Sequence, residues 1–272
     1  MRPSRNFYSL LTGKIPACSA SLNSRRRRNA DSATEAMKTG FVFDLDGTLV
    51  DSIPGIARGL NLALESLGYP EHSVEAIRGM VGRGARELCV AALRGYFNGP
   101  VPESAFEALH AGFMREYRHT WENGTVPYAG IREMLLQLAE EGHPLGVLSN
   151  KPHVVTVPLV HHVFPDVPFR IVMGFSERFP RKPEPDSLLS IVHEWGRKPE
   201  EACMVGDSAH DGNTAVNAGT RLVLVGWGYS TRAALDAFHV PVCGSVQELS
   251  FCLEHEGNLP FPVLKQGDEV SE

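Results

Sequence analysis

Two acidic residues separated by one position, Asp44 and Asp46, are the feature of this sequence that most directly suggests catalysis. They follow the apolar run Phe41–Phe43, which predicts a buried strand, and Gly47 then turns the chain. Residues i and i+2 of an extended chain lie on one side, so a strand end presents both carboxylates together. Because close carboxylates repel, one ionises easily and the other holds its proton. The pair can therefore supply a nucleophile and a general acid.

The same stretch allows two other interpretations. An Asp-Gly pair after an apolar run is also a signal for a β-hairpin. A calcium loop that begins at Asp44 would need an acid at its fifth position and a Glu at its twelfth. Those positions hold Thr48 and Gly55, so the calcium loop is rejected.

More polar groups follow apolar segments in the second half of the chain. Strands are predicted at residues 145–148, 170–173, 203–205 and 222–225. Helical patterns separate these strands, which predicts right-handed crossovers and a parallel sheet. Ser149 and Asn150 follow the first of them, Lys182 lies in a loop, and Asp207 and Asp211 follow the third. Because the carboxyl ends of parallel strands share one edge, we expect these side chains to meet the acid pair there.

The predicted sheet is interrupted by residues 54–127, which show helical patterns and no clear strand. We interpret this segment as a helical cap inserted into the sheet domain. The catalytic core is then expected to consist of residues 37–53 and 128–255. A polar tail, residues 256–272, follows the core.

The charge of the chain is unevenly distributed. Residues 1–36 hold seven Lys/Arg and two acids, whereas the remainder holds 19 basic and 30 acidic residues. This basic N-terminal segment, expected to be disordered, fits an organelle transit peptide, a basic tail or an overextended start upstream of Met37. The acidic remainder is a poor candidate for nucleic-acid binding. No apolar run approaches the roughly 18 residues that a transmembrane helix needs.

The cysteines indicate a reducing compartment. They are Cys18, Cys89, Cys203, Cys243 and Cys252. Their number is odd and they lack metal-type spacing, so we expect mostly buried thiols. A cytoplasmic location is expected, or an organelle if residues 1–36 are a transit segment, and a monomer or a homodimer.

Four motifs together resemble those of the haloacid dehalogenase superfamily of phosphohydrolases. They are residues 44–52 (DLDGTLVDS), 149–151 (SNK), 182–185 (KPEP) and 206–211 (GDSAHD). Softer similarities to its phosphoglycolate phosphatase branch are PYAG at 127–130, GRG at 82–84 and WGY at 227–229. The resemblance covers residues 41 to about 230. It implies an α/β fold with a doubly wound, mostly parallel, Rossmann-like sheet and an inserted helical cap.

The resemblance also implies a division of roles. Asp44 would attack phosphorus and form an aspartyl-phosphate, and Asp46 would protonate the leaving alcohol and then activate water. Lys182 would stabilise charge on Asp44 and the phosphoryl group. Mg²⁺ would be held by Asp44, Asp207 and the backbone carbonyl of Asp46, and Asp211 would fix Lys182 or a metal-bound water.

Phosphate and substrate contacts are expected from a second set of residues. The resemblance assigns phosphate binding to Gly47, Thr48, Ser149 and Asn150. Arg83, between two glycines of the cap, is our hypothesised partner for a substrate carboxylate, although a solvated helix face explains it equally well.

The expected function is magnesium-dependent hydrolysis of a small phosphate monoester, with 2-phosphoglycolate as first choice. Alternatives within the superfamily are a pyrophosphatase, a nucleotide or sugar-phosphate phosphatase and a phosphomutase. From a different class, a non-catalytic binding protein remains as an alternative. The expected partner is a small phosphorylated metabolite, with neither nucleic acid nor membrane.

Overall fold

A six-stranded sheet forms the centre of the described chain. The computed structural model describes residues 38–263. The strand order is β5-β4-β1-β6-β7-β8, and every neighbouring pair is parallel. The strands are β1 (Gly40–Phe43), β4 (Leu145–Pro152), β5 (Ile171–Phe175), β6 (Ala202–Gly206), β7 (Arg221–Val225) and β8 (Val242–Cys243). The predicted α/β class with a mostly parallel sheet is confirmed.

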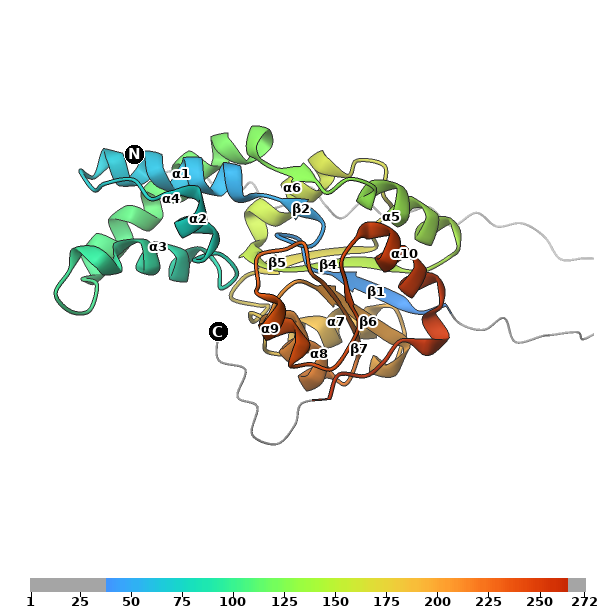
Figure 1. Cartoon of the computed structure of the whole chain (residues 1–272). Coiled ribbons are helices and arrows are strands. Elements are labelled where there is room, and N and C mark those ends of the chain that lie inside the picture. Colours follow the sequence, from blue (N-terminus) through green and yellow to red (C-terminus); the bar gives the residue numbers. More distant parts are fainter. Residues whose placement is uncertain (1–37, 264–272) are drawn as a thin grey trace, which may run out of the picture. The chain divides into compact units, whose positions relative to one another are not determined.

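Helices cover both faces of this sheet (Figure 1). They are α5 (Ile131–Glu140), α6 (His153–Val163), α7 (Asp186–Glu194), α8 (Ala209–Ala218), α9 (Arg232–Asp236) and α10 (Val246–Glu254), with short 3₁₀ turns at Pro199–Glu201 and Glu256–Asn258. Phe41 and Phe43 of β1 share a buried cluster with α5, α6 and α10, whereas Val42 lies in a cluster with α7, α8 and α9. This alternation follows from the two-residue period of a strand.

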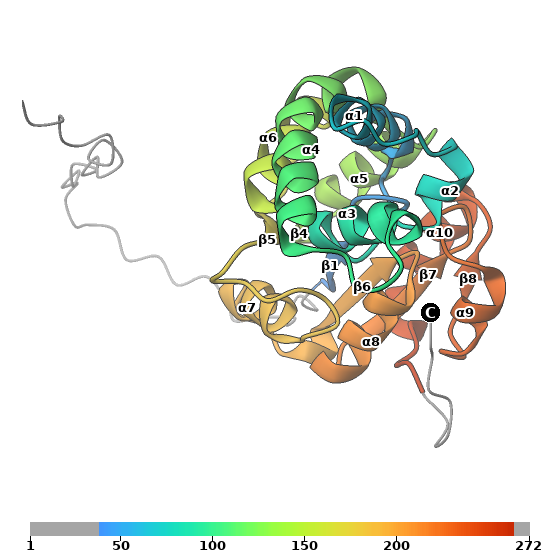
Figure 2. The same ribbon diagram turned by 90° about the vertical axis from the view of Figure 1, so that its left-hand side faces the viewer.

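Four helices lie between two very short strands. They are α1 (Ile53–Ser66), α2 (Val74–Arg78), α3 (Ala85–Leu93) and α4 (Glu103–Gly124), with a 3₁₀ turn at Arg94–Tyr96. We call them the helical segment. Strands β2 (Val50–Asp51) and β3 (Val126–Pro127) pair in antiparallel fashion at its two ends. α1 and α4 pack side by side (Figures 1 and 2).

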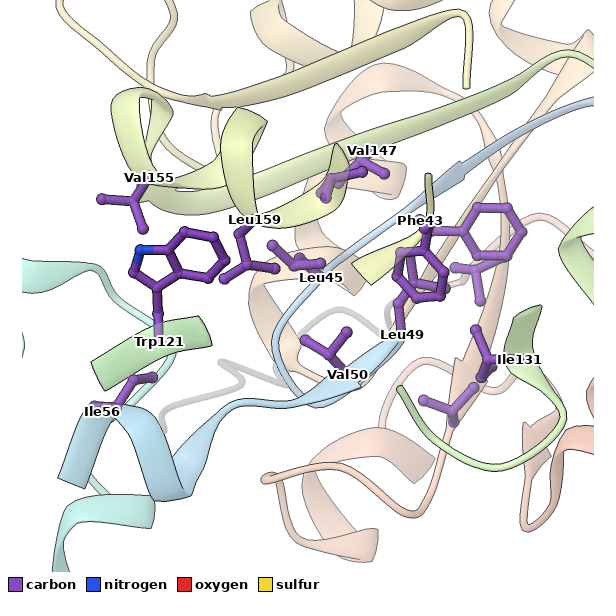
Figure 3. Packing of buried hydrophobic residues seen from close by; sticks show 14 of the residues in the cluster. Phe43, Leu45, Leu49, Val50, Ile56, Trp121, Ile131, Val147, Val155 and Leu159 are labelled. Atoms are coloured by element: carbon purple, nitrogen blue, oxygen red, sulfur yellow. The ribbon is translucent and has the colours of Figure 1, made fainter. Parts of the chain in front are cut away.

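The helical segment shares a hydrophobic core with the sheet. Trp121 of α4 and Ile56 of α1 belong to the same buried cluster as Val155 and Leu159 of α6. Figure 3 shows Leu159 between Trp121 and Leu45, a residue that follows β1. The helices therefore lie next to the carboxyl end of β1, where the acid pair is found.

Two details differ from the sequence-based expectations. β4 does not end at residue 148 but continues to Pro152, with a shift in register against β5 between Ser149 and Pro152. The β2–β3 pair was not expected, because two-residue strands are too short to show alternation. The predicted segment 1–36 lies outside the described residues, as does the tail beyond residue 263. No helix within residues 38–263 has the length and apolar composition needed to cross a membrane.

Candidate active site

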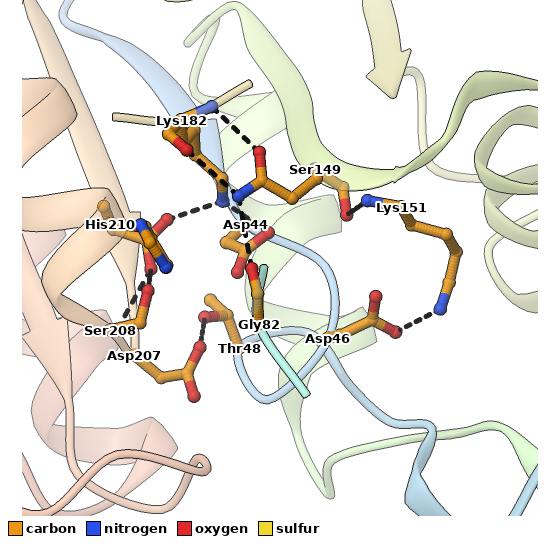
Figure 4. Close-up of polar contacts among 12 residues, drawn as sticks. Asp44, Asp46, Thr48, Gly82, Ser149, Lys151, Lys182, Asp207, Ser208 and His210 are labelled. Atoms are coloured by element: carbon orange, nitrogen blue, oxygen red, sulfur yellow. Dashed lines mark hydrogen bonds and ion pairs between the residues drawn. The ribbon is translucent and has the colours of Figure 1, made fainter. Parts of the chain in front are cut away.

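A buried ion-pair network surrounds the first acid. Asp44 directly follows β1, and its backbone N–H donates to the carbonyl of Val205 in β6. Nζ of Lys182 lies 2.7 Å from Oδ1 of Asp44 and 2.6 Å from Oδ1 of Asp211 (Figure 4). All three side chains are buried. The ammonium group of Lys182 therefore joins the end of β1 to the start of α8.

Asp211 is held in place from both of its oxygens. While Oδ1 accepts from Lys182, Oδ2 accepts from the hydroxyl of Ser208 at 2.6 Å and from the backbone N–H of Ser208 at 3.0 Å. Asp211 lies in the first turn of α8, where an acid also interacts favourably with the helix dipole. This arrangement holds the ammonium group of Lys182 between Asp44 and Asp211, and the role of Asp211 in fixing Lys182 or a metal-bound water stays a prediction.

Asp207 is the third buried carboxylate of the cluster. It follows β6 and accepts hydrogen bonds from the hydroxyl of Thr48 at 3.2 Å and from the backbone N–H of Tyr229 at 2.7 Å. Gly47 and Gly228 leave room for it, since a Cβ on either residue would collide with the carboxylate. Gly47 also has a φ of +85°, which favours glycine.

Burial raises the pKa values of two of these acids. The pKa of Asp44 lies well above its usual range because the group is desolvated, with Lys182 opposing the shift and Asp211 and Asp207 adding to it. Burial, and then Asp211, raise the pKa of Asp207 to about 7. The sequence predicts repulsion between Asp44 and Asp46. In the structure Asp211 and Asp207 are the carboxylates that raise the pKa of Asp44. Asp46 has a lysine of its own.

That second lysine is Lys151. Its Nζ lies 2.9 Å from Oδ1 of Asp46 and donates to the hydroxyl of Tyr117 in α4 at 3.0 Å. The hydroxyl of Ser52 also donates to Oδ1 of Asp46, at 2.5 Å. The Asp46 and Lys151 side chains are only 13% and 5% exposed. Asp46 is thus oriented by residues from β4 and from the start of α1.

Ser149 and Asn150 lie inside β4 rather than in a turn after it. The hydroxyl of Ser149 accepts from the backbone N–H of Lys151 at 3.1 Å. The amide of Asn150 donates to the carbonyls of Gly82 and Lys182, both at 3.2 Å, and its Oδ1 accepts from the N–H of Lys182 at 2.8 Å. Asn150 therefore connects Gly82 of the helical segment to the loop that carries Lys182. Both of its amide hydrogens are donated to backbone carbonyls.

Two cavities meet at the acid pair, and both are lined by Asp44 and Asp46. The first, here called the buried cavity, has a volume of about 50 Å³, and its lining includes Lys151, Tyr117 and Ser149. The second, the wide cleft, has a volume of about 630 Å³, and Arg83, Asp207 and Tyr229 contribute to its lining. Substrate can thus approach the acids from the wide cleft, while the buried cavity offers room for only a small group.

Residues 41–225 match the family described as haloacid dehalogenase-like hydrolase. The chain belongs to this family. It is 35% identical over 197 residues to a phosphoglycolate phosphatase from Pseudomonas putida, with 72% of each chain covered. It is 32% identical to phosphoglycolate phosphatase 1 from Pseudomonas aeruginosa, covering 81% of this chain and 82% of that protein.

A solved structure shows the same fold. It is that of a predicted phosphoglycolate phosphatase from Haemophilus somnus, with a TM-score of 0.67 and 29% identity, and it covers 72% of this chain and 88% of that one. These likenesses place the protein in the phosphoglycolate phosphatase-like branch of the haloacid dehalogenase-like hydrolases. It is a phosphoric monoester hydrolase that acts on a small phosphorylated substrate.

Some residues predicted from the sequence occupy the site differently from expectation. The N–H of Gly47 donates to the carbonyl of Val50, and the hydroxyl of Thr48 is bonded to Asp207. These two residues shape the acidic loop, and their contact with phosphate stays a prediction, as does that of Asn150. Arg83 is exposed at the wide cleft.

Sequence reasoning did not assign Lys151, Tyr117, Ser52 or Tyr229. One signal was available for Lys151, which lies two residues after Ser149 and so on the same side of an extended strand. Recognising it required the knowledge that β4 continues past residue 148. Ser52 lies six positions after Asp46, inside the motif at residues 44–52, but its contact with that acid was not assigned. Tyr117 and Tyr229 come from distant parts of the chain, and only the fold brings them to the acids.

The donor set of the site suits a hard divalent cation. Carboxylate oxygens of Asp44, Asp207 and Asp211 lie within 4.8 Å of one another. Among residues 38–263, four carboxylates, including that of Asp46, face the ammonium groups of Lys151 and Lys182. Oxygen donors are the ligands that Mg²⁺ prefers, and two positive charges would balance the excess. Asp211 accepts three hydrogen bonds, one of them from the ammonium group of Lys182. Asp207 accepts one bond from a neutral donor on each oxygen, and Lys182 contacts Asp44 at Oδ1, so Asp44 and Asp207 are the better direct ligands.

Proposed function

We propose that the protein is a magnesium-dependent phosphatase that forms an aspartyl-phosphate on Asp44, with 2-phosphoglycolate as its substrate. The observation that carries the proposal is the pairing of each acid with its own buried lysine, Asp44 with Lys182 and Asp46 with Lys151. Two carboxylates held in different environments are suited to different roles in one reaction. The relatives named phosphoglycolate phosphatase support the choice of substrate.

In the first step, Oδ2 of Asp44 attacks phosphorus while the bond from phosphorus to the ester oxygen breaks. Lys182 contacts Oδ1 of Asp44. Within residues 38–263, Oδ2 of Asp44 has no ion-pair partner and can act as the nucleophile. Asp46 donates a proton to the departing oxygen from Oδ2, because Ser52 and Lys151 both contact its Oδ1. In the second step, water attacks phosphorus, Asp46 accepts its proton, and the carboxylate of Asp44 is released.

Charge stabilisation comes from groups already in place. Lys182 would compensate charge on Asp44 and on the phosphoryl oxygens, and the hydroxyl of Ser149 would donate to one of those oxygens. Mg²⁺ held by Asp44, Asp207 and the backbone carbonyl of Asp46 would neutralise phosphate charge. The helical segment would act as the cap, because it supplies much of the lining of the buried cavity and so excludes water from the leaving group.

The buried cavity favours a small leaving group. A water needs roughly 10–15 Å³ of space measured in this way, so 50 Å³ takes about three to five such groups. Glycolate, with about five non-hydrogen atoms, is of this size. A nucleoside or a sugar would require the helical segment to move away. The small volume of this cavity supports the choice of 2-phosphoglycolate over nucleotide and sugar phosphates.

Phosphate release from a panel of monoesters tests the proposal directly. We expect turnover of 2-phosphoglycolate with Mg²⁺ and none after chelation. Acid quenching during turnover of substrate labelled in the phosphoryl group should leave label on the protein, and Asp44→Asn should leave none. Release without any label on the protein would refute the covalent step. Turnover of other monoesters but not of 2-phosphoglycolate would refute the substrate.

A further inference from the structure

One positively charged side chain, that of Lys151, lines the buried cavity within the described residues. Among its lining residues in the described chain, the charged side chains are those of Asp44, Asp46 and Lys151. A buried ammonium group is costly unless charged or polar partners compensate its lost hydration. Here the partners are the carboxylate of Asp46 and the hydroxyl of Tyr117. Lys151 therefore places positive charge where the leaving group of a substrate must lie.

The ammonium group of Lys151 lies close to the place where a carboxylate carried by the leaving alcohol of the substrate would be. The ester oxygen must contact Asp46 to receive a proton, and in 2-phosphoglycolate a single methylene separates that oxygen from the carboxylate. Nζ of Lys151 is 2.9 Å from Oδ1 of Asp46, so a carboxylate attached in this way comes within its reach. We propose that Lys151 and Tyr117 bind a carboxylate on the leaving alcohol and so select short acidic phosphate monoesters. This inference rests on the proposed phosphatase function.

Both residues have a hydrogen to offer. An ammonium group has three N–H donors, and within residues 38–263 two of those of Lys151 have partners. Tyr117 accepts from Lys151, so its own O–H can donate elsewhere. Burial raises the pKa of Tyr117, which keeps this hydroxyl protonated. A carboxylate in the cavity would receive one hydrogen bond from each residue, and Tyr117 would connect recognition to the helical segment.

The walls of the cavity strengthen such a contact. Ile56, Leu88, Phe113 and Met114 line it, and a charged pair interacts more strongly beside apolar walls than in bulk water. Arg83, by contrast, is exposed at the wide cleft, where solvent and salt screen its charge. Lys151 is therefore the stronger candidate for carboxylate recognition, and Arg83→Ala serves as a comparison.

The experiment compares three substrates with the same phosphoryl group. They are 2-phosphoglycolate, its neutral counterpart 2-hydroxyethyl phosphate, and p-nitrophenyl phosphate, whose leaving group needs little help from an acid. Lys151→Met and Tyr117→Phe test the site, and exposed Lys198→Met is the matched control. The measured quantity is the ratio of kcat/KM for 2-phosphoglycolate to that for 2-hydroxyethyl phosphate. Any effect that acts through Asp46 lowers kcat/KM for both alkyl phosphates and cancels in the ratio. The ratio therefore reports only the contribution of the substrate carboxylate.

We expect Lys151→Met to lower this ratio roughly 10- to 150-fold, mainly through KM, because a hydrogen bond to a charged group is lost. Tyr117→Phe keeps the charge and should lower the ratio about 3- to 10-fold. Lys198→Met should leave it unchanged, and Arg83→Ala should change it less than Lys151→Met does. A ratio within about twofold of wild type in Lys151→Met would overturn the proposal.

A binding measurement separates this proposal from the phosphatase assignment. In the Asp44→Asn background, 2-phosphoglycolate should raise the melting temperature more than 2-hydroxyethyl phosphate does. Adding Lys151→Met should abolish that difference. If wild type hydrolyses none of the three substrates, the proposed function fails, and the melting experiment still decides on the carboxylate site. Equal shifts in melting temperature from the two ligands in the Asp44→Asn protein would overturn the proposed carboxylate site.

Discussion

Lys182 and Asp44 form a buried ion pair at the end of β1, with 2.7 Å between Nζ and Oδ1. The same ammonium group also contacts Asp211, so one cation compensates two buried acids. Removing one member of such a cluster leaves uncompensated charge in a poorly hydrated site, which is strongly destabilising. The network is therefore important both for catalysis and for the stability of the fold around the site.

Replacement of Lys182 should affect stability and activity together. Lys182→Met is expected to cost about 3–5 kcal/mol in the free energy of unfolding, because Asp44 and Asp211 lose their counter-ion. It should also lower kcat at least about a hundredfold, the scale of losing one charge-stabilising donor. Denaturant unfolding and phosphate release measure the two effects. Adding Asp211→Asn should recover part of the stability and none of the activity. Recovery of activity in the double variant would contradict the proposed role of Lys182.

Replacement of Asp44 should affect activity far more than stability, because Asp211 still compensates the charge of Lys182. Asp44→Asn keeps the size of the side chain and removes one buried charge, so the protein should still fold. Loss of a nucleophile usually costs several orders of magnitude in kcat, and we expect that scale here. A residual rate above about a hundredth of wild type would be incompatible with attack by Asp44. Circular dichroism of the variant provides the control for folding.

Gly47 provides a steric test of the acidic loop. A Cβ at this position would collide with the carboxylate of Asp207, and its φ is +85°. Gly68 has a similar φ of +78° and no heavy atom near its missing Cβ, so it is a matched control. Both Ala variants should lose about 1–3 kcal/mol of stability through backbone strain.

Only Gly47→Ala should also displace Asp207. We expect it to lower kcat/KM at least about tenfold and to weaken the response of the melting temperature to Mg²⁺, because a displaced ligand binds the metal poorly. Activity assays and melts of the two variants, with and without Mg²⁺, make the comparison. Equal losses of activity in Gly47→Ala and Gly68→Ala would show that strain, rather than the contact with Asp207, controls the effect.

The sequence predicted the parts of the site that are close along the chain. Asp44 and Asp46 are recognisable from their spacing alone, and the strand that precedes them is where the pattern placed it. The contact of Lys151 with Tyr117 was not accessible in this way, because 34 positions separate the two residues. It depends on β4 continuing past Ser149 and on α4 bringing Tyr117 to the end of that strand. The bond from Tyr229 to Asp207 likewise requires the loop after β7 to fold back over the site.

The fold itself was easier to predict from the sequence, because apolar runs and helical periodicity are local patterns. The ends of the strands were harder to predict, as β4 illustrates. Residues 149–152 are largely polar, yet they remain extended because Asn150 bonds to the backbone of Gly82 and Lys182. A polar run that continues a strand in this way is stabilised by tertiary contacts, which no local pattern reveals.

The pH dependence of Mg²⁺ binding provides a test independent of turnover. Without a cation, burial and Asp211 raise the pKa of Asp207 to about 7, above the value of an unfolded chain. The native state therefore binds more protons than the unfolded state between about pH 4 and pH 7, so this group's contribution to stability falls as pH rises through that window. Mg²⁺ needs the ionised carboxylate and relieves the repulsion.

We therefore expect Mg²⁺ to raise the melting temperature more at about pH 8 than at about pH 5.5, where protons compete for Asp207. Asp207→Asn removes the titrating charge, so its metal-free protein should be at least as stable as wild type at the higher pH. The variant should also lose most of its response to Mg²⁺, because an amide is a poorer ligand than a carboxylate. Equal Mg²⁺-induced shifts at both pH values in wild type would show that Asp207 does not bind the metal.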